Sequence, residues 1–228
     1  MKQQGQTDHL SNSLTDLMTS LMVIFILLLV TKLNNQASEV TSAVNRVLKE
    51  LQAHAKALGD NERIYAQGDI IVIVIPDELM SFQQGSAQQG GANLSAAGRG
   101  YLRRHVPAWS ALLCHPDNRR DIDTIIVEGH ADRTPFGNLG EKFSKEKNLE
   151  LSQQRSMAVV AEALGNLDGT PQQACFLDLL SATGRGDAHP LDEQNPNSER
   201  NRRVEVRIRV RPNVAGAVSK QTEGSAAK

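Results

Sequence analysis

Residues 122–134 read IDTIIVEGHADRT and join an apolar run to a polar one. The apolar part, Ile122 to Val127, is rich in β-branched residues, which is typical of a buried strand. The polar part, Glu128 to Thr134, leaves the end of that strand. The segment therefore predicts a buried strand that presents Asp132 and its neighbours beyond its last residue.

Patterns on either side of this strand predict further helices and strands. Asn93 or Ser95 can cap a helix that Pro107 should kink or split. A polar segment with valines and leucines at helical spacing predicts a connector helix that ends near Gly59. The order β-α-β-α-β-β predicts an α/β fold, a two-layer α/β sandwich. The expected elements are helices over 34–62, 94–113 and 151–164 and strands over 70–75, 122–127, 179–183 and 203–210.

The last strand alternates apolar and charged residues, which predicts one buried face and one solvated face that carries its arginines. The 25 basic residues nearly cancel the 26 acidic ones, so the charge balance does not favour nucleic acid as a partner. No nucleophile, base and orienting group fall into a recognisable pattern. We therefore expect neither an enzyme nor a resident metal or cofactor.

Residues 14–33 form a nearly uncharged apolar stretch. As a helix, these 20 residues would be about 30 Å long, enough to span the hydrocarbon core of a bilayer. A cleaved signal peptide is the alternative, but Lys2 is balanced by Asp8 and residues 35–37 make a poor cleavage site. We expect a retained transmembrane helix.

Asp16 is an unusual residue at the start of this apolar stretch. On a helix it would share a face with Thr19 and Ser20, which makes a narrow polar stripe. An acid inside a membrane commonly marks an ion path. At the headgroup level it would instead cap the helix. The spacing alone leaves both interpretations open.

Cys114 and Cys175 are the two cysteines of the chain. Zinc sites need more ligands at closer spacing. In the periplasm the pair could form a disulfide that closes a loop of about 60 residues and contributes roughly 4 kcal/mol. In the cytosol the two residues would be buried thiols.

Three strings in this order resemble the OmpA-like peptidoglycan-binding domain over roughly residues 68–211. They are VEGHADRT at 127–134, NLELSQQR at 148–155 and NRRVEV at 201–206. The resemblance implies a site for the diaminopimelate of the peptidoglycan stem peptide, whose ammonium and carboxylate share one stereocentre. Asp132 would bind the ammonium, and Arg155 would bind the carboxylate through two hydrogen bonds. The other residues that the resemblance places in this pocket are Thr134, Asn148, Leu151 and Arg202.

The string DLMTSLM at 16–22 is similar to the start of the transmembrane helix of the flagellar stator family MotB. This likeness implies that Asp16 carries a coupling ion, H⁺ or Na⁺, with Thr19 and Ser20 facing the pore. It also implies a homodimer inside a ring of MotA/ZorA-like subunits, five copies around the dimer. Residues 34–62 carry no specific signature of a pore plug.

The short N-terminus, the short connector and the two cysteines look more like ZorB, the MotB-like family of the Zorya anti-phage defence system. A flagellar-type stator and a passive wall tether are the alternatives. The expected location is the bacterial inner membrane, with the N-terminus cytoplasmic and the C-terminal domain periplasmic. The expected segments are a cytoplasmic N-terminus at 1–13, a transmembrane helix at 14–33, a helical connector at 34–67, the OmpA-like domain at 68–211 and a disordered tail at 212–228.

Overall fold

The structure, a computed structural model, describes residues 4–60, 63–80, 92–135 and 140–211. The expected tail at 212–228 lies outside these residues. The chain divides into two compact units, Met1–Val40 and Thr41–Lys228, which are described separately below.

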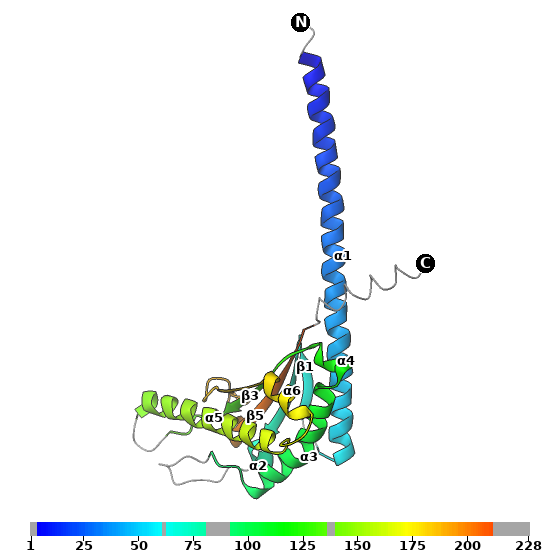
Figure 1. Cartoon of the computed structure of the whole chain (residues 1–228). Coiled ribbons are helices and arrows are strands. Elements are labelled where there is room, and N and C mark those ends of the chain that lie inside the picture. Colours follow the sequence, from blue (N-terminus) through cyan, green and yellow to red (C-terminus); the bar gives the residue numbers. More distant parts are fainter. Residues whose placement is uncertain (1–3, 61–62, 81–91, 136–139, 212–228) are drawn as a thin grey trace. The chain divides into compact units, whose positions relative to one another are not determined.

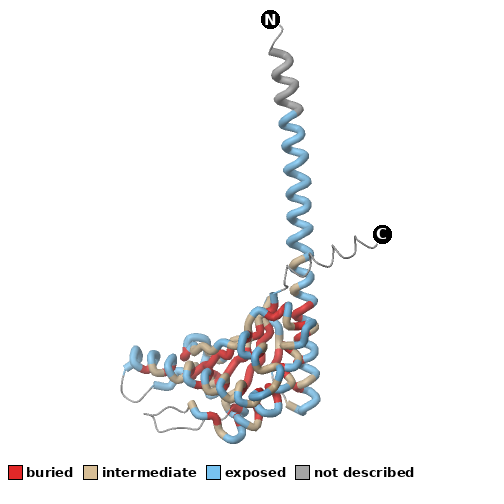
Figure 2. Tube along the Cα trace, in the orientation of Figure 1, coloured by how far each residue is buried: buried red, intermediate tan, exposed pale blue. Residues whose placement is uncertain are grey.

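The first unit holds most of helix α1 (Gln4–Leu58). The apolar residues from Leu14 to Leu33 are exposed along it (Figure 2). Among the described residues, this is one helix long and apolar enough to cross a membrane, by length and composition. Asp16, Thr19 and Ser20 lie within this helix, as the sequence predicts, and all three are exposed.

The second unit is built on a five-stranded sheet in the order β1-β2-β5-β3-β4. Helices pack against this sheet (Figure 1). The pairs β1–β2, β2–β5 and β5–β3 are antiparallel, and β3–β4 is parallel. The two-layer α/β architecture agrees with the sequence-based prediction. The strands are β1 (Arg63–Gln67), β2 (Ile70–Pro76), β3 (Ile122–His130), β4 (Leu180–Gly184) and β5 (Arg203–Val210).

Strand β1 corrects the sequence analysis, which placed residues 63–67 in a helical connector. These residues pair with β2, and Gln67 lies opposite Ile70. The two residues between them, Gly68 and Asp69, form the hairpin loop, and Gly68 has the positive φ of 64° that such loops require. A Gly-Asp pair before an apolar run was the available signal.

The helices cover the sheet and extend beyond the expected boundaries. Ser95 caps α3 by accepting a hydrogen bond from the Gly98 N–H, and Pro107 does not split that helix. Helix α5 starts well before Leu151, because pairs such as Lys145–Glu141 support a first half that lacks an apolar stripe. The helices are α2 (Asp77–Met80), α3 (Ala96–Leu113), α4 (Pro116–Arg119), α5 (Gly140–Gly165), α6 (Gln172–Leu179) and the 3₁₀ turn η1 (Glu199–Asn201).

The part of α1 within the second unit belongs to its core. Val44, Val47 and Leu51 are buried, as their helical spacing predicts. The ring of His54 meets His105 of α3 edge to face. The compact unit therefore begins before residue 68, where the sequence analysis started the domain.

A disulfide joins two of the helices, and two glycines allow a third helix to lie close to the sheet. Cys114, at the end of α3, is bonded to Cys175 in α6, which confirms the disulfide. Helix α5 lies so close to β3 that a Cβ on Gly129 would be 2.1 Å from the carbonyl oxygen of Ser152. Gly184 of β4 also lies close to α5, because a Cβ on Gly184 would be 2.5 Å from the main-chain nitrogen of Gln153. These contacts fix α5 over the ends of β3 and β4.

Candidate functional site

The topology brings two acids to the same end of the sheet. Strands β2 and β3 flank β5 and run antiparallel to it, so Pro76 and His130 both lie opposite Arg203. The residues just beyond those strands, Asp77 and Asp132, therefore lie on either side of Arg202.

Arg202 links these acids. Its Nη1 donates to Oδ2 of Asp132 at 2.8 Å, and its Nε donates to Oδ2 of Asp77 at 3.1 Å. Its Nη2 lies 3.0 Å from Glu199. Burial alone would lower the pKa of Arg202, but the bonds to Glu199, Asp132 and Asp77 outweigh it and raise the pKa. Arg202 is thus a permanent cation between two carboxylates.

Helix α5 supplies the second guanidinium. Arg155 is only 9% exposed, and its Nη1 lies 4.0 Å from Oδ1 of Asp77. Burial lowers its pKa, because the charged form loses hydration. That Asp77 oxygen is buried and accepts no hydrogen bond from the described residues. A buried acceptor without a donor is costly, so this oxygen is suited to receive a ligand donor.

Two further residues hold Asp132 in place. The amide of Asn148 donates to the main-chain oxygen of Asp132 at 3.1 Å, and the main-chain N–H of Thr134 donates to Oδ1 at 3.0 Å. Asn148, Leu151 and Arg155 follow one another at helical spacing on α5, and Leu151 is half-buried. The structure therefore gathers Asp132, Thr134, Asn148, Arg155 and Arg202 at one end of the sheet.

Sequence reasoning missed Asp77. The only available signal was an acid directly after a predicted strand that ends at Pro76. With Asp77 included, two carboxylates face two guanidiniums across the site. Such a set can bind a zwitterion, because a ligand ammonium finds oxygen acceptors and a ligand carboxylate finds planar two-donor cations.

A second cluster of charged residues lies next to this site, and it is buried where the sequence analysis expected a solvated surface. Arg203 and Glu205 were expected on a solvated strand face, but they are 5% and 4% exposed. They lie opposite His130 and Glu128 on β3. The segment after β4 covers them, since Arg203 donates to the main-chain oxygen of His189 at 3.1 Å. Alternation identifies the two faces of a strand but not what covers each face.

Arginines neutralise the carboxylates of this cluster. Arg203 and Arg207 bind the two oxygens of Glu205 at 2.7 and 2.9 Å, and Arg185 binds Glu128 at 3.0 Å. Burial would raise the pKa of Glu128, but contacts with His130 and Arg185 outweigh it and lower the pKa to about 2. Glu128, His130 and Glu205 approach the geometry of metal ligands. Their carboxylates are already held by these cations, so the arrangement is an ion-pair network.

The polar residues of the membrane stretch interact with their own helix. The hydroxyl of Thr19 donates to the main-chain oxygens of Thr15 and Asp16, at 2.8 and 2.9 Å. Such bonds satisfy a hydroxyl in an apolar environment. They leave the Asp16 carboxylate on the same helix face, as the spacing predicts.

Comparison with known proteins gives a family and a fold. Residues 88–203 match the OmpA family. A MotB-like protein from Desulfovibrio vulgaris is 22% identical with a TM-score of 0.54, over 76% of this chain and 94% of that one. The periplasmic domain of Helicobacter pylori MotB is 18% identical with a TM-score of 0.49, over 75% of this chain and 96% of that one.

The cell wall anchor of the type VI secretion system from Pseudomonas aeruginosa is 21% identical with a TM-score of 0.46, over 72% of this chain and 96% of that one. No curated protein matches the chain. At 22% identity and a TM-score of 0.54, the Desulfovibrio vulgaris structure supports the fold of this chain and nothing beyond it.

Proposed function

Because the chain belongs to the OmpA family, we propose that its second unit binds peptidoglycan and that its apolar helix anchors it in the bacterial inner membrane. The observation that carries the proposal is the convergence of Asp77, Asp132, Arg155 and Arg202 at one end of the sheet. The proposed ligand is the diaminopimelate of the stem peptide. The proposed topology has the N-terminus in the cytoplasm and the second unit in the periplasm.

The site offers both kinds of charge that the ligand needs. The ammonium of diaminopimelate would bind Asp132 and Oδ1 of Asp77, which accepts no hydrogen bond from the described residues. Its carboxylate would bind Arg155, whose buried guanidinium lies in a fixed position on α5. Charge-assisted hydrogen bonds of this kind are about twice as strong as neutral ones, so a small zwitterion can hold the domain to the wall.

Sedimentation with insoluble peptidoglycan tests this site. The Arg155→Lys variant keeps the positive charge but loses the planar pair of N–H donors, so we expect much less of this variant to sediment with peptidoglycan. Retention of Arg155→Ala should fall at least as far. Arg120→Lys is the matched control, because Arg120 is exposed at the end of α4 and away from the site. Retention of both Arg155 variants at the wild-type level would contradict the assignment.

We further propose that the chain is the B subunit of an ion-driven motor. In this proposal a homodimer stands within a ring of about five MotA/ZorA-like subunits, and Asp16 carries H⁺ or Na⁺ beside Thr19 and Ser20. The support is the polar stripe in an otherwise apolar helix, since an acid within a membrane usually has an ion or a partner. One charge crossing 100 mV releases about 2.3 kcal/mol, so a useful step needs several ions.

The short connector between the apolar stretch and the first strand, together with the disulfide, favours the ZorB type of motor, which serves anti-phage defence. The test is phage plating on a host that carries the intact locus, with wild type compared with Asp16→Asn. Glu39→Gln is the control, because Glu39 is an exposed acid on α1 beyond the apolar stretch. Protection lost only with Asp16→Asn supports this proposal. Absence of protection by either form favours a motility stator, and protection by both favours a passive tether.

A further inference from the structure

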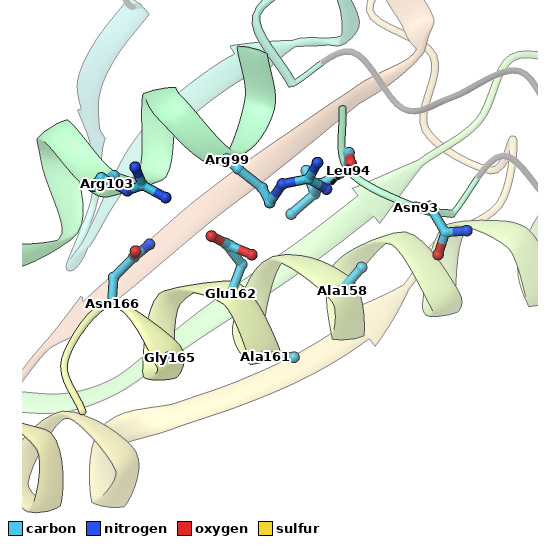
Figure 3. A pocket seen from close by; sticks show the side chains of 9 residues that line it. All are labelled: Asn93, Leu94, Arg99, Arg103, Ala158, Ala161, Glu162, Gly165 and Asn166. Atoms are coloured by element: carbon cyan, nitrogen blue, oxygen red, sulfur yellow. Dashed lines mark hydrogen bonds between the residues drawn. The ribbon is translucent and has the colours of Figure 1, made fainter. Parts of the chain in front are cut away.

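An open groove of about 770 Å³ lies between α3 and α5 (Figure 3). Arg99 and Arg103 extend into it from α3, and they are faced from the opposite side by Glu162 of α5 and by Asn166, the first residue after that helix. Beside Glu162, α5 contributes only small residues to the lining of the groove: Ala158, Ala161 and Gly165. Its volume is within the range of small-molecule sites.

The polar groups of this groove do not satisfy one another. Within the described ranges, Arg103 and Glu162 form no ion pair although they face the same space. Arg99 uses one nitrogen on the main-chain oxygen of Leu94, and its other guanidinium donors have no hydrogen-bond partner among the described residues. The Nδ2 of Asn166 is buried and has no hydrogen-bond partner among the described residues. Buried polar groups without partners are uncommon, and a ligand acceptor would account for this one.

The charges indicate what such a ligand must carry. Arg99 and Arg103 lie one turn apart on the same helix face, where like charges repel unless an anion lies between them. Two guanidiniums and one amide donor are suited to a carboxylate. The carboxylate of Glu162 can accept an N–H from the same molecule. A peptide with a free side carboxylate offers both groups.

The groove continues the candidate site along α5. Arg155, Ala158 and Glu162 follow at intervals of three and four residues, so they lie on one flank of the helix, and Asn166 follows four residues later, just beyond its end. Glu162 is seven residues beyond Arg155, which corresponds to about 10 Å along the helix axis. In the stem peptide, the long side chain of diaminopimelate separates its zwitterionic end from the neighbouring residue by a comparable length. A peptide bound at Arg155 can therefore extend into the groove.

We propose that this groove is a second subsite for the peptidoglycan stem peptide and that Arg99 and Arg103 bind the free carboxylate of the D-glutamate next to diaminopimelate. This inference rests on the proposed function and deepens it. The site at Arg155 binds the zwitterionic end of diaminopimelate, and the groove binds the residue next to it. Stem peptides with an amidated D-glutamate lack the charge that the arginines bind.

The test uses the full chain in detergent and two purified muropeptides that differ only in whether the D-glutamate carboxylate is free or amidated. We expect wild type to bind the free form about tenfold more tightly, and we expect Arg99→Gln/Arg103→Gln to bind both forms with the affinity of the amidated one. Arg104→Gln is the matched control, because Arg104 is an exposed arginine of the same helix that does not line the groove. It should retain the discrimination.

Each other outcome overturns the subsite in a recognisable way. Equal affinity of wild type for the two muropeptides would remove the inference and leave the proposed function in place. If the double variant loses affinity for both muropeptides equally, the arginines contribute only a general positive charge and do not recognise the D-glutamate carboxylate. Failure of wild type to bind either muropeptide would remove the proposed function as well.

Discussion

Nη1 of Arg202 lies 2.8 Å from Oδ2 of Asp132, so an acid expected to bind the ligand is already paired within the protein. The same guanidinium also holds Asp77. Arg202 therefore fixes the separation of the two carboxylates, and Oδ1 of Asp77, which accepts no hydrogen bond from the described residues, lies 4.0 Å from Nη1 of Arg155. A site held in place before binding loses less conformational entropy when its ligand arrives.

Asp77 should be as important for wall binding as Asp132. In Asp77→Asn the Oδ1 oxygen no longer carries charge, so we expect peptidoglycan affinity to fall roughly tenfold, as expected for one charge-assisted hydrogen bond. Co-sedimentation at several peptidoglycan concentrations measures this change. Asp123→Asn removes an exposed acid on β3 and should leave binding unchanged. Wild-type affinity of Asp77→Asn would exclude Asp77 from the site.

The domain should lose stability in mild acid. Burial lowers the pKa of His105, which contacts Asp60 and lies near His54 and Arg104. A lowered pKa in the folded state favours neutral histidine there. Its stabilisation is therefore complete above the unfolded pKa of about 6.5 and is lost as the pH falls below that value.

His130 behaves in the same way, because burial lowers its pKa among Glu128, Arg203 and Glu205. We expect the urea midpoint to fall between pH 7 and pH 5, and His130→Gln should show a shallower slope. Below pH 4.5 Glu128 adds to the decline, because the unfolded chain then takes up a proton on Glu128 while the folded protein, in which the pKa of Glu128 is about 2, does not. A midpoint independent of pH between 7 and 5 would contradict these pKa directions.

Reduction of the disulfide should destabilise the second unit without abolishing its fold. The Cys114–Cys175 bond closes a separation of 61 residues. The chain-entropy model gives an upper value of about 4 kcal/mol for such a loop, and measured values are often smaller. Thermal unfolding with and without reductant measures the effect. The Cys114→Ser/Cys175→Ser variant should melt at the lower temperature and show no further response to reductant.

Gly129→Ala should disturb both stability and binding. The added methyl would overlap the carbonyl oxygen of Ser152, a backbone atom that cannot rotate away. We expect about 1–3 kcal/mol of destabilisation, as for other overpacked positions. Because α5 carries Asn148 and Arg155, its displacement should also weaken peptidoglycan retention. Gly165→Ala is the control, since a Cβ there meets nothing within 4 Å. Equal stability of the two variants would show that α5 can shift freely.

The candidate site was only partly accessible from sequence. Asp132 and Arg155 stand in strings with a characteristic order and spacing, and the structure places them at the same end of the sheet. Asp77 has no motif of its own, because its position depends on the pairing of β2 with β5. The groove beside Arg103 was equally inaccessible, because it forms only where α3 and α5 lie side by side.

By itself the sequence determined the local features of this protein. The apolar stretch from Leu14 to Leu33, the Ser95 cap of α3 and the alternation along β5 follow from side-chain chemistry at short spacing. Tertiary structure alone decided that Arg203 and Glu205 are buried and that Asp77 and Asp132 share Arg202. The physical reason is that burial and charge pairing depend on which distant segments cover a residue, and the strand order of the sheet sets those neighbours.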